Sequence, residues 1–509
     1  LLLAILTLSY SQIIFEYPEG GGAYIVSKSN LGEWPGLTAA ASLMIDYVLT
    51  VAVSVAAGIA AITSAIPSLF PHRTILGVLA IVTVLLVNLR GVRESGKVFA
   101  IPTYMFIGAI LLMLGVGLKQ LLFGQVSPVV SQSLAAQSAV ESVSLFLLLR
   151  AFSSGCTALT GVEVISNGVS AFRAPEPKNA AITMAMMAIV LGTLFLGIST
   201  MAYHLGVVPK EDETVVSQVA RATFGEGMLY YLVQGSTMLI LVLAANSAFA
   251  GFPRLASLLA RDGFMPHQMA MMGDRLVFSN GIMILGAFSC FLIAVFGGDT
   301  HALIPLYAVG VFLSFTLAQA GMVRRWLTKR GPHWRKKLTV NGIGAVTTAI
   351  ATVIIASTKF VHGAWIVIVL IPLLILMFRK IRSHYKAVSE QITLDRRGQR
   401  PPMPRRNIVV IPISGVNRAV IRAVDYARSR PGEIRAVLVD LDPEETAKLE
   451  IQWAQWGCGV NLVTLPSPYR SVLRSLLNYI EEILEKEPDT WVTVVIPEIL
   501  PARWWHNML

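Results

Sequence analysis

Residues 150–179 read RAFSSGCTALTGVEVISNGVSAFRAPEPKN, and this stretch indicates how the rest of the chain is organised. It begins as a hydrophobic membrane span, yet it carries an acidic residue, Glu163, near its centre. A carboxylate in the middle of a span costs about 2.5–3.5 kcal/mol on insertion scales, so it usually marks a transport path. Gly155, Gly161 and Gly168 would let the backbone unwind, as it does where secondary transporters bind their substrates. The stretch therefore predicts a broken helix at the centre of a membrane transporter.

Composition points to a membrane protein over most of the chain. Of the 509 residues, 54% are hydrophobic and only 14% are charged. Apolar runs long enough to cross a bilayer recur through roughly the first 380 positions. The net charge of +11 comes mostly from Lys and Arg in the short connections between spans, as the positive-inside rule expects. This pattern excludes a soluble enzyme and argues against nucleic acid as a partner.

The apolar runs set the predicted topology. Spans are predicted near residues 1–15, 35–66, 75–88, 98–118, 150–167, 180–201, 228–250, 281–296, 303–321, 341–357 and 363–378. The cationic loops, such as residues 90–97, should lie in the cytoplasm. Counting from them places the C-terminus in the cytoplasm as well. A further helix is expected to precede Leu1, which lies inside an apolar run.

One face of the span predicted at residues 35–66 carries four polar side chains: Asp46, Tyr47, Thr50 and Ser54. At 100° per residue they fall within an arc of roughly 100°. An acid, a phenol and two hydroxyls on one face predict a narrow polar lane, of which Ser54 is the weakest member. The structural alternative is that Asp46 bonds to a neighbouring helix and the hydroxyls bond to carbonyls of their own helix.

The composition changes after residue 380. Residues 381–406 read as a basic, proline-containing linker. Beyond them, strands are predicted at 407–414, 435–441, 459–465 and 491–496, with a helix at 469–485. Because helical stretches alternate with buried strands, residues 407–509 should form a small α/β domain with a parallel sheet.

Four segments together resemble the amino acid–polyamine–organocation superfamily: YPEGGGAY (17–24), NLRGVRESGK (88–97), ALTGVEVISNGVSAFRAPEPKNA (158–180) and ANSAFAGFPRLASLLARDGFMP (245–266). The resemblance covers residues 1–380 and implies an α-helical integral membrane protein with the leucine-transporter-like fold. That fold is an inverted repeat of five plus five helices, followed by two more, in which the first and sixth helices are unwound. On this map residues 150–179 are the sixth of twelve helices, and the first helix is missing from the sequence.

A set of polar residues narrows the resemblance to the proton-coupled potassium importers of the KUP family, particularly the KimA branch. The set is Asp46, Tyr47, Thr50, Ser54, Thr160, Glu163 and Tyr307. The resemblance implies that Asp46, Thr50, Thr160 and Tyr307 hold potassium. It also implies that Tyr47 and Ser54 line the ion path and that Glu163 couples the proton. Oxygen ligands of these kinds suit a dehydrating K⁺.

No cofactor is expected, because K⁺ and H⁺ are themselves the transported ions. The alternative is a proton-coupled amino-acid permease of the same superfamily. In such a permease the broken helices bind the carboxylate and the amine of the substrate.

Residues 407–509 resemble the universal-stress-protein type of α/β fold. They lack its glycine-rich phosphate loop, because Gly415 alone follows the first predicted strand. The potassium-importer resemblance implies a homodimer formed through this domain and a response to cyclic di-AMP. Basic linker residues could face that anion or lipid headgroups: Arg396, Arg397, Arg405 and Arg406. The sequence as a whole predicts a multi-pass protein of the plasma membrane.

Overall fold

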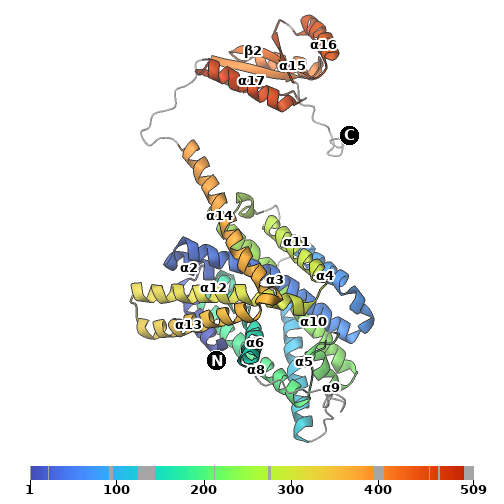
Figure 1. The fold of residues 1–509 in the computed structure, drawn as a ribbon, viewed down its shortest axis with the longest axis vertical. Coiled ribbons are helices and arrows are strands. Elements are labelled where there is room, and N and C mark those ends of the chain that lie inside the picture. Colours follow the sequence, from blue (N-terminus) through green and yellow to red (C-terminus); the bar gives the residue numbers. More distant parts are fainter. Residues whose placement is uncertain are drawn as a thin grey trace. The chain divides into compact units, whose positions relative to one another are not determined.

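The computed structural model describes residues 2–20, 22–90, 96–123, 144–210, 212–272, 277–393, 406–457, 459–467 and 471–497. The chain divides into two compact units, Leu1–Gln391 and Ile392–Leu509. Figure 1 shows the first unit as a bundle of helices and the second as a small sheet with helices around it.

Among the residues that the structure describes, the first unit contains eight segments long and apolar enough to cross a membrane. They are Glu33–Ala65 (α3), Pro67–Leu89 (η1 and α4, Arg73–Leu89), Phe99–Leu122 (within α5, Gly96–Leu122), Leu145–Asn167 (α6, η2 and α7), Glu176–His204 (α8), Met228–Arg261 (α10), Thr300–Thr328 (α12) and Trp334–Thr358 (α13). Two shorter apolar helices, α1 (Leu2–Glu16) and α11 (Ser279–Val295), and the long helix α14 (Trp365–Ile392) cover the other predicted spans. Two short helices, α2 (Gly22–Leu31) and α9 (Val215–Phe224), lie between spans.

Helix α3 is the centre of this unit and packs against α10, α12 and α2. Its middle is rich in small residues, which let neighbouring helices approach closely, as is common between membrane helices. A Cβ added to Gly310 of α12 would lie 3.2 Å from the carbonyl oxygen of Ser42. Glycine at this position leaves room for the close approach of α12 to α3, which brings the polar face of α3 against α12.

Helix α14 extends past its apolar part to Ile392, so the first half of the predicted linker is helical. Three side chains on this extension contact elements that lead into or out of the bundle. The guanidinium of Arg379 lies 4.1 Å from the ring centroid of Trp34, and Nη1 of Arg382 donates to Oε2 of Glu33 at 2.8 Å. The ring of Tyr385 stacks on His267 with centroids 4.3 Å apart. These contacts fasten α14 to the start of α3 and to the segment after α10. Residues 394–405, which include Arg396, Arg397 and Arg405, lie outside the described residues.

The second unit contains a four-stranded parallel sheet with the strand order β3-β2-β1-β4. The strands are β1 (Arg406–Ile413), β2 (Glu433–Asp440), β3 (Asn461–Pro466) and β4 (Thr490–Val494). Helices α15 (Arg418–Arg428) and α16 (Pro443–Trp456) cover one face through Val424 and Trp453, and α17 (Val472–Lys486) covers the other through Leu476. The predicted α/β pattern is confirmed. The strands alternate with helices along the chain, and these helices bury both faces of the sheet.

Candidate functional site

The helix predicted to break does so at Gly161, and α7 ends at Gly168, whereas Gly155 lies inside the continuous helix α6. Helix α6 (Leu145–Cys156) leads into a 3₁₀ turn, η2 (Thr157–Leu159), and then Thr160 is extended. Gly161 follows with φ +96°, a left-handed conformation that favours glycine, and α7 (Val162–Asn167) begins after it. The break frees backbone groups in the middle of a membrane span, where only a protein-lined or watery site tolerates them.

Two carboxylates are buried beside this break. Asp46 of α3 and Glu163 of α7 are each 1% exposed, and they are close enough to interact electrostatically. The freed N–H of Gly161 donates to both carboxylate oxygens of Glu163 at 3.1 Å. Oδ1 of Asp46 has no hydrogen-bond partner among the described residues. A buried carboxylate oxygen without a donor is costly in a protein interior, which makes it a natural ligand for a cation.

Three hydroxyls lie around Asp46 and the break. Oγ1 of Thr50, one turn from Asp46 on α3, donates to the phenol oxygen of Tyr307 on α12 at 3.2 Å. Thr50 also interacts with the Asp46 carboxylate, and Tyr307 with Thr160 at the break. The residues predicted to hold potassium therefore come together from α3, α12 and the unwound segment.

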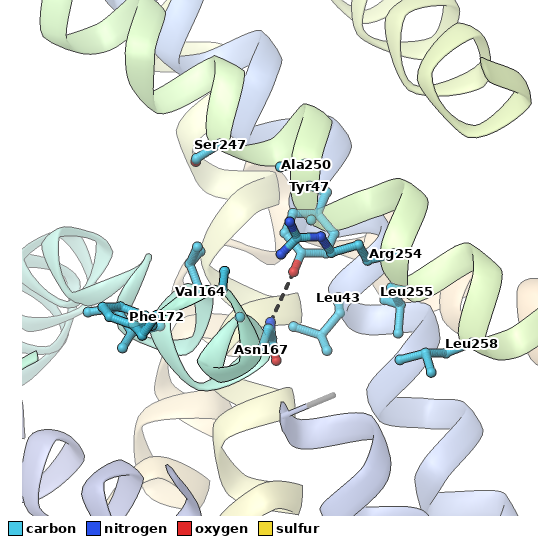
Figure 2. Close-up of a pocket in the computed structure, with 14 residues that line it drawn as sticks. Leu43, Tyr47, Val164, Asn167, Phe172, Ser247, Ala250, Arg254, Leu255 and Leu258 are labelled. Atoms are coloured by element: carbon cyan, nitrogen blue, oxygen red, sulfur yellow. Dashed lines mark hydrogen bonds between the residues drawn. The ribbon is translucent and has the colours of Figure 1, made fainter. Parts of the chain in front are cut away.

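Tyr47 faces a neighbouring cavity. Its phenol oxygen accepts a hydrogen bond from Nδ2 of Asn167, at the end of α7, at 2.9 Å. Figure 2 shows this bond as a dashed line, and Tyr47, Asn167 and Arg254 of α10 all line a cavity of about 270 Å³. The ring fits against α10 because residue 251 is glycine, since a Cβ there would lie 2.5 Å from it. Tyr47, the neighbour of Asp46 in the chain, thus lines this cavity.

Ser54 is half-buried two turns beyond Asp46 on α3, and no hydrogen bond joins it to the described residues. Its place on the ion path stays a prediction.

Asn167 and Arg254 were not predicted as site residues. Asn167 donates to Tyr47 on one side and lies close to Gly20, after α1, and Gly22, at the start of α2, on the other. A Cβ on Gly22 would lie 1.6 Å from its Oδ1, and a Cβ on Gly20 would lie 2.6 Å from its backbone oxygen. The glycine run of YPEGGGAY was therefore the signal in the sequence for a close approach by another segment. Nothing in the sequence identified Asn167 as that partner.

The comparisons with known proteins cover both units. A family model described as "Amino acid permease" matches residues 1–378, and one described as "KimA potassium transporter C-terminal domain" matches residues 405–509. The chain is 46% identical over 512 residues to "Potassium transporter KimA" of Bacillus subtilis (strain 168). That similarity extends over 100% of this chain and 84% of the relative.

Proposed function

The chain belongs to the amino acid permease family and is a potassium importer related to KimA, and from that premise we propose that it couples potassium entry to protons by alternating access. Its apolar helices make it a multi-pass membrane protein. The family is one of transporters, and K⁺ is the substrate that the relative's name supplies.

The potassium site we propose consists of Asp46, Thr50, Thr160 and Tyr307. The unpartnered Oδ1 of Asp46 is the observation that carries this proposal, because it lies beside the Thr50–Tyr307 hydrogen bond. Carboxylate, hydroxyl and phenol oxygens can replace the hydration shell of K⁺ without a rigid cage. Tyr47 and Ser54 would line the path on either side of this site.

Glu163 is the proposed proton carrier. It is buried on the inner half of the broken helix, next to Asp46, and its carboxylate is held by the Gly161 N–H. A carboxylate in this position can exchange its proton when the half-helix moves and changes its surroundings. Movement of α7 relative to α3 would therefore link the state of Glu163 to the ion at Asp46.

The proposed architecture is the five-plus-five inverted repeat, with α6 and α7 as the two halves of the sixth helix. A C-terminus in the cytoplasm would place the cavity beside Tyr47 on the inner side of the site. The second unit would then be a cytoplasmic domain with a fold like that of universal stress proteins.

Uptake of rubidium into proteoliposomes tests the proposed function. When the outside solution is more acidic than the inside, rubidium should accumulate well above the level reached without the gradient, because protons that move inward drive its entry. A mixture of labelled amino acids, offered to the same vesicles, should not accumulate. Uptake of amino acids without rubidium would overturn the potassium assignment, and rubidium uptake indifferent to the gradient would overturn proton coupling.

The second unit is proposed to form a homodimer and to bind cyclic di-AMP. A cavity of about 710 Å³ lies where β1, β2 and β4 end, which is where parallel sheets bind nucleotides. Strand β4 is an edge strand, and its Trp491 is 60% exposed among the described residues, as expected of a surface that pairs with another copy.

Light scattering of the purified full chain should give the mass of two copies, and Trp491→Lys should reduce it to one. Cyclic di-AMP should raise the melting temperature of the full chain, while AMP should not. A monomer in the unmodified protein would contradict dimerisation, and equal effects of the two nucleotides would contradict the effector.

A further inference from the structure

The connection between α12 and α13 carries five exposed cations. The two helices pack side by side (Figure 1), and the spans Thr300–Thr328 and Trp334–Thr358 meet at this connection. It therefore lies at the depth of the lipid headgroups, where membrane helices leave the hydrocarbon. The exposed basic side chains, which together form a basic turn, are those of Arg324, Lys329, Arg330, Arg335 and Lys336.

The five cations have no acidic partners in the described part of the chain. Glu16, at the end of α1, pairs with two other cations of the same segment, Arg325 at 2.6 Å and Lys337 at 3.8 Å. No ion pair joins a described carboxylate to any of the five. Because like charges this close in the chain repel one another, an anion that lies among them is bound favourably.

Two of these cations lie against one aromatic ring. The guanidinium carbon of Arg330 is 5.3 Å from the ring centroid of Trp334, and that of Arg335 is 5.5 Å from it. The same ring packs against the core of the first unit. A guanidinium on an aromatic face keeps its N–H donors free, and its plane is held in place for a partner with two oxygens. Two such guanidiniums beside one ring can bind a phosphate.

The backbone of the turn fixes this arrangement. His333 has φ +56°, a left-handed conformation that residues other than glycine seldom adopt. A residue held in this way often marks a functional position, because the surrounding structure has to favour it. Trp334 follows as the first residue of α13, and its N–H donates to the carbonyl oxygen of Gly331 at 3.2 Å. Helix α13 thus starts beside the end of α12, where Lys337 lies 4.3 Å from the ring centroid of Trp326.

We propose that the basic turn binds the headgroup of an anionic phospholipid, whose phosphate lies between the guanidiniums of Arg330 and Arg335. The other three cations of the turn add attraction to the negative charge. Leu327, three residues before Arg330 in the last turn of α12, is an apolar side chain that is 51% exposed, and it offers a surface to an acyl chain. The basic turn is separate from the proposed ion path, so this proposal goes beyond potassium transport.

A lipid fits this surface better than a soluble anion does. Tryptophan is common where membrane helices meet the headgroups, and basic residues next to a span attract anionic lipids. A soluble phosphate would use the two guanidiniums but would leave Leu327 exposed to water. The phosphate of a lipid, in contrast, is already at the depth of Trp334.

The experiment measures the binding of fluorescent phosphatidylglycerol to the purified full chain in a neutral detergent. Arg330→Gln with Arg335→Gln should weaken binding by at least about tenfold, because each cation near an anionic headgroup contributes about fivefold. Trp334→Leu keeps all five charges and should weaken binding by about threefold, because the guanidiniums lose the ring that orients them. Phosphatidylcholine, which has no net charge, should bind weakly to every variant.

Lys380→Gln with Lys386→Gln is the matched control. Both lysines are exposed on α14, and neither lies against an aromatic ring in the described chain, so the same charge is removed without the paired arginines. Binding should then change by about twofold at most, since isolated exposed charges contribute little. Both double variants alter exposed side chains, so the melting temperature of the lipid-free protein should not change.

Two results would overturn the proposal. Equal losses of binding in the two double variants would show that the lipid responds to net charge and not to the basic turn. Equal competition by glycerol phosphate, mole for mole with the lipid, would show a site for soluble phosphate and not for a lipid. Rubidium uptake does not enter these measurements, so a failure here is distinct from a failure of the proposed transport function.

Discussion

Asp46→Asn should reduce rubidium uptake by at least about 100-fold, the largest effect expected of any single substitution in this chain. The side chain is 1% exposed, and its Oδ1 has no partner among the described residues, so a bound cation would be its main interaction. An amide offers the cation an oxygen but no charge. In a site of low dielectric the lost attraction amounts to several kcal/mol, and about 1.4 kcal/mol corresponds to a factor of ten.

The measurement is the initial rate of rubidium uptake as a function of its concentration. Asn is nearly the same size as Asp, so the melting temperature should change little. Asp299→Asn is a suitable control, because Asp299 caps the start of α12 and lies outside the cluster. Uptake that survives in Asp46→Asn with an unchanged half-saturating concentration would show that Asp46 does not hold the ion.

Glu163→Gln should abolish accumulation driven by a pH gradient and should spare exchange of rubidium for potassium. Gln keeps the shape of the side chain, and its oxygen can still accept from the Gly161 N–H, so the broken helix should keep its form. It cannot carry a proton. The ion therefore still reaches its site, but no proton movement drives it.

Two assays on the same vesicles separate these effects. Counterflow, with potassium inside and labelled rubidium outside, should stay within about tenfold of the unmodified protein, because one hydrogen bond contributes about 0.5–1.5 kcal/mol and about 1.4 kcal/mol corresponds to a factor of ten. Accumulation under a pH gradient without internal potassium should disappear. Glu176→Gln, in the first turn of α8, makes the same chemical change outside the cluster and should affect neither assay. Persistent pH-driven accumulation in Glu163→Gln would remove this residue from proton coupling.

The broken helix shows how much of the site the local sequence predicts. Gly161 adopts φ +96°, which a residue with a Cβ resists, so a break within this glycine-containing span could be predicted, but Gly155 stays helical, so glycine alone did not place the break. The polar face of α3 was predictable for a similar reason, because the helical period alone fixes which side chains share a face. The family resemblance then supplied the candidate residues, and the family matches are consistent with it.

The extension of α14 could not be predicted from composition. Residues 381–392 are charged and follow an apolar span, so they read as part of a linker, but charged residues form an exposed helix equally well. The contacts of Arg379 with Trp34 and of Arg382 with Glu33 favour the helix, and both partners lie more than 300 positions earlier in the chain. No local pattern contains that information.

What the sequence determined by itself was the set of spans, a break within the span at residues 150–167, the polar face of Asp46 and Thr50, and the α/β character of the second unit. Each follows from periodicity, apolar length or the conformational freedom of glycine, which act over a few residues. The tertiary structure alone decided that Thr50 meets Tyr307, 257 positions away, and that Tyr47 accepts a hydrogen bond from Asn167. Helical periodicity fixes the direction in which a side chain points on its own helix, whereas the neighbour it meets depends on how closely the helices pack, and glycines such as Gly22, Gly251 and Gly310 set that distance.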